Sequence, residues 1–390
     1  MTTKRSRQIS LKTLAIIIFI TSNLLAAKPQ EPDWSKRMDE LRNLLSELLP
    51  TVISDKEFNS PQNFKTIEAE AKKLAELTHG MPEGRLPDAD PSINLIAGLF
   101  KNEINNAYTH LINGRREYAR AVLKSVPRYC IACHTRSSSS LDLSSLQQDV
   151  PKVLDTSLEK AEFFDATWQF DRALNEFEKI LNDSELSKDH QLEWQRAAYY
   201  AIATSVRVKR DPDRALAVVK LIINGEDVPQ FMKRDALRWQ QSLLQWKNET
   251  AREFKTANDL LNEADRLMSV ASNLQKYPTD RSGDISYLRA SSYLHDFLSQ
   301  YPNNPDTSKA LLMLGTCYEI LQAPELWFVD ELYYEACIRN SPNTEIAETC
   351  FDRYEQSIFL GYSGSSGVSL PYDVKKNLKE LKKLATPPND

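Results

Sequence analysis

Apolar side chains recur every three or four residues along most of the chain, which is the periodicity of one face of an α-helix. Four such stretches come first and predict helices over 33–49, 63–77, 91–112 and 115–134. The seam of the first consists of Trp34, Met38, Leu41, Leu45 and Leu48. Pro50 is expected to end that helix, because proline removes a backbone hydrogen bond. Four helices joined by mostly short connections predict an up-down-up-down bundle.

The second half restarts the helical pattern after a polar, serine-rich stretch at 137–151, which is expected to be a linker. Small and bulky residues then occur at Ala161, Phe164, Phe170, Ala173, Phe177 and Ile180, and the frame recurs at Ala203, Val206, Ala215, Val219 and Ile222. This spacing resembles tetratricopeptide repeats, in which small residues let two helices of a hairpin approach closely. An irregular helical region without true repeats is the alternative.

Two proline-led segments support a repeat. Pro305-Asp306-Thr307 and Pro342-Asn343-Thr344 lie 37 residues apart, close to the tetratricopeptide period. The polar residue after each proline is expected to cap the next helix. Five or six degenerate hairpins are predicted between 152 and 361, followed by a C-terminal loop and helix at 362–390. The predicted fold class is therefore all-α, a four-helix bundle followed by an α-solenoid.

The amino-acid composition agrees with the all-α class and argues against several classes of function. Only 10 of the 390 residues are glycine, which argues against a turn-rich β-sandwich or barrel. The formal net charge of −5 is far from that of a basic nucleic-acid binder. No arrangement typical of a catalytic triad or a nucleotide-binding loop is found, so the sequence predicts a binding or electron-transfer protein and not an enzyme.

The first 27 residues have the layout of a secretory signal peptide. A basic head containing Lys4, Arg5, Arg7 and Lys12 precedes a short apolar stretch that ends in Ala26-Ala27. An uncleaved anchor is the alternative. We expect export to the periplasm and a mature chain without a membrane span, because no later apolar run is long enough to cross a bilayer.

Candidate chemistry is concentrated at Cys130-Ile131-Ala132-Cys133-His134. This is the pattern of covalent c-type haem attachment: two thiols bind the porphyrin vinyl groups, and the histidine is the proximal ligand of the iron. A redox dithiol or half of a zinc site are the alternatives. A zinc site needs a second pair of ligands, and Cys317, Cys337 and Cys350 have no cysteine or histidine three or four residues away.

The four predicted helices and the position of this motif resemble the cytochrome c-prime family over about residues 28–136. Members of that family carry the attachment motif near the end of the fourth helix, often with a basic residue just before it, as Arg128 is here. The resemblance implies one covalent haem c and a propionate contact for Arg128. Pro127, which is expected to kink the fourth helix, departs from the family pattern.

The ligand opposite His134 is predicted from topology. In an up-down-up-down bundle, the end of the fourth helix lies beside the start of the first, where Met38 occupies the inward seam. A thioether ligand would raise the reduction potential and suit electron transfer. His79, Met81 or an open iron position are the alternatives, and Met38 as plain core packing is a further one. His110 is excluded because it lies at the far end of the bundle.

Three functions follow from these observations. The first is a mono-haem cytochrome that acts in electron transfer or redox sensing. Its repeats would dock a protein partner, and its haem would exchange electrons with a redox partner protein. The second is a gas-binding haem protein, and the third is an envelope adaptor in which haem is secondary. A Cys337–Cys350 disulfide is left open by the sequence.

Overall fold

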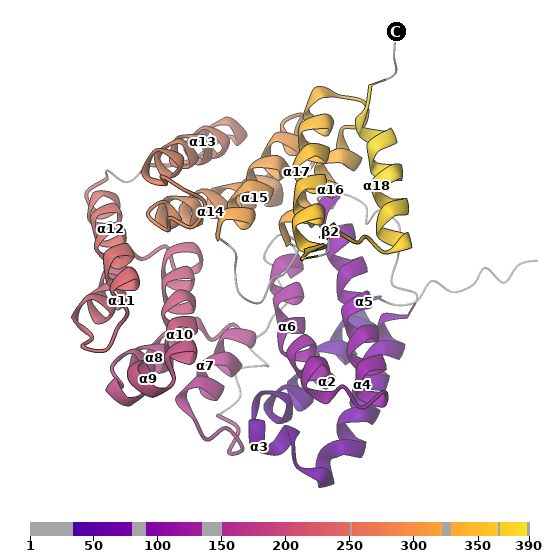
Figure 1. The fold of residues 1–390 in the computed structure, drawn as a ribbon, viewed down its shortest axis with the longest axis vertical. Helices are drawn as coiled ribbons and strands as arrows, with labels where there is room; N and C mark the ends of the chain where they lie inside the picture. The colour runs from indigo at the N-terminus through magenta and orange to yellow at the C-terminus, as the bar shows by residue number, and fades with distance from the viewer. Residues whose placement is uncertain are drawn as a thin grey trace, which may run out of the picture. The chain divides into compact units, whose positions relative to one another are not determined.

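In the computed structural model, the described part of the chain comprises residues 34–79, 91–134, 150–249, 252–321, 329–365 and 367–387. This part is almost entirely helical, which confirms the predicted all-α class (Figure 1). Its strands are β1 (Ser363–Gly364) and β2 (Gly367–Val368), which pair as an antiparallel hairpin. The predicted signal peptide and nearly all of the predicted linker lie outside the described residues.

Contacts between Cα atoms divide the chain into two units, residues 1–43 and residues 44–390. The helix α2 begins in the first unit and ends in the second. The elements of the first third are α2 (Trp34–Ile53), α3 (Asp55–Phe58), the 3₁₀ turn η1 (Pro61–Asn63), α4 (Phe64–Thr78), α5 (Pro91–Ile112) and α6 (Arg116–His134).

The helices α4, α5 and α6 match the predicted ranges to within one residue, but the prediction for the first helix was wrong at its end. The helix α2 continues through Pro50 to Ile53. The reason is burial beyond the proline: Val52 is 0% exposed and Ile53 is 3% exposed. Burying these two side chains stabilises the extra turn against the lost backbone hydrogen bond.

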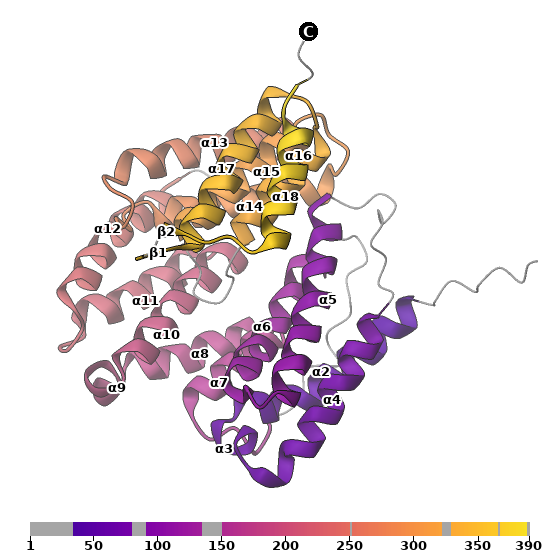
Figure 2. The same cartoon turned by 45° about the vertical axis from the view of Figure 1, so that its right-hand side comes forward.

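The helices α5 and α6 form a hairpin, side by side in Figure 2, and α4 packs on α5. The turn between them uses Gly114 at φ +75°, a conformation that glycine adopts without steric cost. On α6, Val122 is buried as an inward apolar position, together with Ala119, Leu123 and Val126, whereas the Tyr118 side chain is 54% exposed. The ring of Tyr118 instead meets His110 edge-on, with the ring centroids 4.3 Å apart.

The remaining helices follow in chain order. They are α7 (Ser157–Ala166), α8 (Phe170–Leu181), α9 (Ser184–Asp189), α10 (Gln191–Ala203), the π-helical turn η3 (Thr204–Val208), α11 (Pro212–Asn224), α12 (Gln230–Lys247), α13 (Ala257–Leu274), α14 (Asp284–Gln300), α15 (Thr307–Leu321), α16 (Val329–Asn340), α17 (Glu345–Gly361) and α18 (Tyr372–Ala385).

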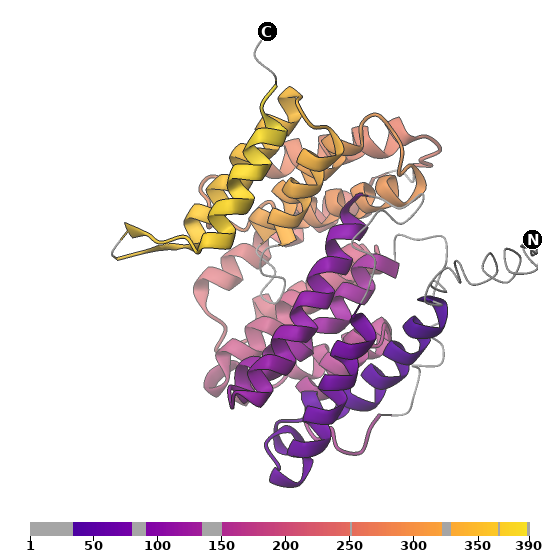
Figure 3. The ribbon, with the colours of Figure 1, turned by 90° about the vertical axis from the view of Figure 1, so that its right-hand side faces the viewer.

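Several consecutive helices of this region pack as pairs, namely α7 with α8, α11 with α12, α13 with α14, and α15 with α16. The predicted packing positions between Ala161 and Ile180 are buried, except that Phe170 is half-buried. The later set is buried as well, except that Ala203 is half-buried. The helix α18 packs on α17, and the hairpin of β1 and β2 projects beyond the end of α17 (Figure 3). The five lysines of α18 are exposed.

The cap of α17 corrects a detail of the repeat prediction. Thr344, and not Asn343, is the N-cap: its hydroxyl accepts a hydrogen bond from the amide of Ala347 at 3.4 Å. Asn343 adopts φ +62°, and its amide donates to the carbonyl of Leu384 on α18 at 2.7 Å. The residue after the proline therefore makes the turn, and the next one caps the helix.

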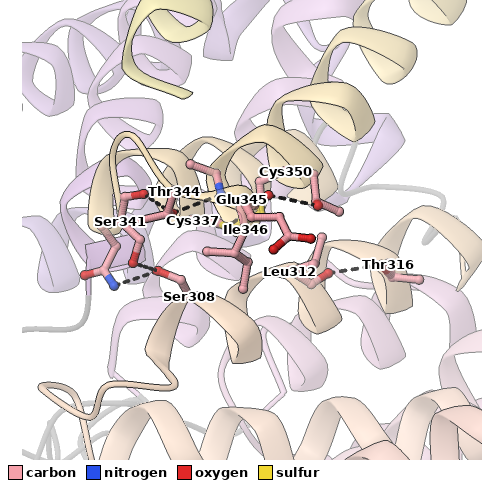
Figure 4. The surroundings of a disulfide bond; sticks show 12 residues. Ser308, Leu312, Thr316, Cys337, Ser341, Thr344, Glu345, Ile346 and Cys350 are labelled. Atoms are coloured by element: carbon pink, nitrogen blue, oxygen red, sulfur yellow. Dashed lines mark hydrogen bonds between the residues drawn. A yellow bond between two sulfur atoms is a disulfide. The ribbon is translucent and has the colours of Figure 1, made fainter. Parts of the chain in front are cut away.

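A disulfide joins Cys337 on α16 to Cys350 on α17, with a Cα–Cα distance of 6.3 Å (Figure 4). Both cysteines are fully buried, and so is Cys317 on α15, which is free. Near the same turn, the hydroxyls of Ser308 and Ser341 lie 2.7 Å apart and tie the end of α16 to α15. The pairing that the sequence left open is therefore Cys337 with Cys350.

Residues 44–134 and the helices from α7 onward share a core. Leu49, Ile53 and Ile96 belong to the same cluster of buried apolar side chains as residues of these later helices. The amine of Lys124 on α6 lies 2.6 Å from a carboxylate oxygen of Glu162 on α7. The domain boundaries at 136 and 151 remain predictions, and these contacts imply that the regions on either side would stay associated after cleavage of the linker.

Candidate functional site

The motif that carries the candidate chemistry ends α6. The backbone stays helical through Cys130, Cys133 and His134, so the two cysteine positions are one turn apart. The side chains of these three residues and of Arg128 lie outside the described part of the chain. The structure therefore locates the motif by its backbone, at the C-terminal turn of a helix of 19 residues.

The opposite end of α6 is held by two arginines that sequence reasoning missed. Arg120 donates to the carbonyls of Val52 and Ile53 at 2.8 Å each, and it also pairs with Asp55. The last carbonyls of a helix lack partners within the helix and carry partial negative charge, so a guanidinium stabilises them. The end of α2 is thereby fixed to the second turn of α6.

Arg116 holds the start of α4 beside the start of α6. Its guanidinium carbon lies 3.5 Å from the centroid of the Phe64 ring, and it donates to the carbonyl of Phe58 at 2.9 Å. Burial lowers the pKa of Arg116 from its usual value, although the carboxylates of Glu68 and Glu117 oppose this effect. The arginine clasp, Arg116 and Arg120, thus gathers the end of α2, the start of α4 and the start of α6.

This arrangement fixes which residues share an end with the motif. Because α4 starts beside the start of α6, its last residue and the cap His79 lie toward the motif end. The His110–Tyr118 contact places His110 at the start of α6, roughly 24 Å along the helix from His134. The expected exclusion of His110 as a ligand is consistent with that placement.

The last described side chain before the motif is Tyr129. It is half-buried, and its ring meets Phe100 of α5 with the ring centroids 6.5 Å apart. Burial, and to a smaller degree the carboxylate of Glu103, raises the pKa of Tyr129 to about 12. The phenol therefore stays protonated at neutral pH.

The candidate distal ligands fall in different parts of the chain. Met38 lies on α2 and is half-buried. His79 is exposed and caps α4, with ψ 129° ending the helix. Met81 lies outside the described residues. The side chains of the motif also lie outside them, so the structure gives no distance between a candidate ligand and those side chains. The prediction of Met38 as the distal ligand therefore stays a prediction.

Elsewhere in the described residues, no group of three or more His, Cys, Asp or Glu could hold a metal ion. Within the same residues, no helix is long and apolar enough to span a membrane.

Sequence reasoning also missed two buried carboxylates, one on α14 and one on α16. Asp284 on α14 is 3% exposed, and burial raises its pKa to about 7 even though Arg281 lies 3.0 Å away. Glu331 on α16 is 9% exposed, and burial raises its pKa to about 7, reinforced by Asp330 and Glu335. The burial of these two residues could not be recognised from the neighbouring sequence, because a charged residue in a helix is normally expected to be exposed.

Replacing Glu331 by glutamine should stabilise the protein at pH 8 and leave it unchanged near pH 4. Because the folded-state pKa is raised, the folded protein retains a proton that the unfolded chain releases above its ordinary pKa of 4.5. Stability is therefore lost as the pH rises from 4.5 to about 7. The neutral glutamine escapes that loss, which amounts to about 3 kcal/mol at most, and it can still accept the hydrogen bond from Ser357.

Urea unfolding of both proteins at pH 4 and pH 8 measures this effect. Asp352→Asn, which changes an exposed carboxylate of α17, is the control and should shift neither midpoint. An equal gain for Glu331→Gln at both pH values would contradict a raised pKa.

Comparison with protein-family models, with curated proteins and with solved structures finds no match for this chain. We therefore infer the function from the motif, its place at the end of α6 and the disulfide.

Proposed function

We propose that the chain is an exported c-type cytochrome that binds one haem c and acts in electron transfer or redox sensing. The observation that carries the proposal is Cys130-x-x-Cys133-His134 on the last turn of a helix whose other end is clamped by the arginine clasp. Two thiols and an imidazole within five residues form the donor set of haem c. The helical backbone places the two cysteine positions about one turn apart.

Each residue of the motif has a separate role in this proposal. Cys130 and Cys133 would form the thioether bonds, and His134 would provide the proximal imidazole. Arg128, two residues before the first cysteine, would pair with a propionate. The bound haem supplies reversible one-electron exchange at its iron.

The buried Cys337–Cys350 disulfide supports export independently of the motif. Disulfides persist in oxidising compartments, and thiols in the cytosol are kept reduced. Covalent haem attachment takes place outside the cytoplasm, so one location accounts for both features. We place the protein in the periplasm, with the leader at 1–27 removed.

The paired helices of residues 152–361 supply the second part of the proposal. Helical hairpins stacked side by side expose an extended surface that suits partner binding, as tetratricopeptide repeats do. We assign this region to docking of a protein partner, with the haem region exchanging electrons with a redox partner. Lys124 and Arg196, which both lie beside Glu162, connect α6 to α7 and α10 and so couple the two regions.

Optical spectra of the purified protein, oxidised and reduced, with and without carbon monoxide, test this function. A six-coordinate low-spin spectrum that carbon monoxide leaves unchanged supports electron transfer. A high-spin iron that binds carbon monoxide would instead favour gas binding. A colourless protein from a host competent in cytochrome maturation would remove the haem and leave the helical repeats as the functional part.

Replacing Met38 by alanine should convert a low-spin spectrum to high-spin and open the iron to carbon monoxide. Met38 lies on the predicted inward seam of α2, and a thioether is an ordinary axial ligand of haem iron. The same spectra recorded on His79→Ala, which changes the exposed cap of α4, serve as the control and should be unchanged. A low-spin spectrum retained in Met38→Ala would remove Met38 from the iron and make His79 and Met81 the next candidates.

A further inference from the structure

A cavity of about 470 Å³ lies between α10, α12 and the segment 277–281 that precedes α14. It is far from the motif in sequence, and no step of the haem proposal uses it. Its walls combine aromatic rings with charged side chains, the composition expected of a small-molecule site.

The carboxylate of Asp235 lines this cavity without a hydrogen-bonding partner among the described residues. The residue is only 9% exposed, and burial raises the pKa of its carboxyl group. Leaving a buried carboxylate without a donor costs free energy that a cationic ligand would recover.

The neighbouring carboxylates already have partners. Asp280 accepts hydrogen bonds from the amides of Lys276 and Ser282 at 2.9 and 3.0 Å and lies 3.4 Å from the guanidinium of Arg238. Asp284 lies 3.0 Å from the Nε of Arg281. The Oδ1 atom of Asp284 is buried and has no hydrogen-bonding partner among the described residues, but of the three carboxylates it is Asp235 that lines the cavity.

The arginines near the cavity also differ in whether they already have partners. Arg281 donates to the carbonyls of Ile320 and Leu321 at 3.0 and 2.8 Å, and Arg238 is bound to Asp280 and Ser282. Arg234 lines the cavity, is exposed and forms no ion pair with the described residues. Arg234 and Asp235, at successive positions of α12, thus both line the cavity. The charges of Arg234, Arg238 and Arg281 lower the pKa of Asp235, but burial has the larger, opposite effect.

Aromatic side chains supply the apolar walls. Phe231 and Tyr277 are 49% and 52% exposed, although each lines the cavity, and Tyr199 closes it from α10. Aromatic faces attract ammonium groups and bury apolar side chains.

The cavity is also preorganised. The indole of Trp239 donates to the carbonyl of Arg281 at 2.7 Å and holds the segment against α12. At Gly283, an added Cβ would lie 2.7 Å from the carbonyl oxygen of Ala271, so the chain packs there as closely as glycine permits. A wall fixed in this way loses little freedom on binding.

We propose that this cavity binds a zwitterionic amino acid with a large apolar side chain. Its ammonium group would meet Asp235, its carboxylate would meet Arg234, and its side chain would lie against Phe231 and Tyr277. The site is a binding function separate from the haem and does not depend on it.

Isothermal titration of the full-length holoprotein with L-phenylalanine tests the proposal, with phenethylamine and hydrocinnamate as probes that lack one charge each. L-Phenylalanine should bind saturably and more tightly than either probe. Asp235→Asn and Arg234→Gln should each weaken it roughly tenfold or more. Phenethylamine should lose affinity in Asp235→Asn but not in Arg234→Gln.

Lys233→Gln, one position earlier on α12 and outside the cavity lining, is the matched control and should bind as the wild type does. Circular dichroism of each variant confirms that it is folded. Absence of saturable heat at millimolar L-phenylalanine, or equal affinity in wild type and in both cavity variants, would overturn the proposal. Equal affinity for phenethylamine and L-phenylalanine would also overturn it, because Arg234 would then have no role.

Discussion

Replacing Cys130 and Cys133 together by alanine should abolish covalent haem. Each thioether uses one cysteine, so a single replacement should weaken retention and the double replacement should leave no covalent link. Haem staining of denatured protein on a gel measures this directly, with expression in a host competent in cytochrome maturation. The expected effect is complete loss of the stain, because no other pair of cysteines in the chain has this spacing.

The matched control is Cys317→Ala. This cysteine is free, fully buried on α15 and remote from the motif in sequence, and burial raises the pKa of its thiol well above the usual value. Its replacement should leave the stain unchanged. Haem stain that persists in the Cys130→Ala, Cys133→Ala double variant would place covalent attachment elsewhere.

Removing the Cys337–Cys350 disulfide should lower the stability of the folded protein. The two cysteines are 13 residues apart and close a loop between α16 and α17. Constraining a loop of that size is worth about 3 kcal/mol through the entropy of the unfolded chain. The double variant Cys337→Ala, Cys350→Ala should therefore unfold at lower denaturant and at lower temperature than the wild type.

Urea unfolding under non-reducing conditions measures the loss. Both sulfurs are fully buried, so the reductant should reach them only when the protein opens, and wild type unfolded in reductant should approach the double variant. An unchanged midpoint in the double variant would contradict a stabilising bond.

The helical elements could be read largely from the sequence. Apolar spacing placed α4 and α5 to within one residue, because each buries a regular stripe that includes Ile67 in the first and Ile104 in the second. The prediction was wrong at Pro50, where a local rule about proline competes with burial of Val52 and Ile53 further along. The rule for proline considers only the local sequence and does not include the burial that packing against a neighbouring helix provides.

The contacts that position the candidate site could not be read in this way. Arg116 and Arg120 look like surface charges in the sequence, yet their partners are carbonyls of residues 52, 53 and 58, supplied by other helices. The same holds for Asp235, whose neighbours come from α10 and the segment before α14. These roles depend on tertiary packing, whereas the haem motif is a local pattern that can be recognised from the spacing of its residues alone.

The intact mass of the denatured protein, purified from a host competent in cytochrome maturation, tests directly whether haem is covalently bound. We expect a chain without its leader at 1–27 that carries the added mass of one haem, retained in denaturant because the link is covalent. A mass equal to that of the polypeptide alone would contradict it.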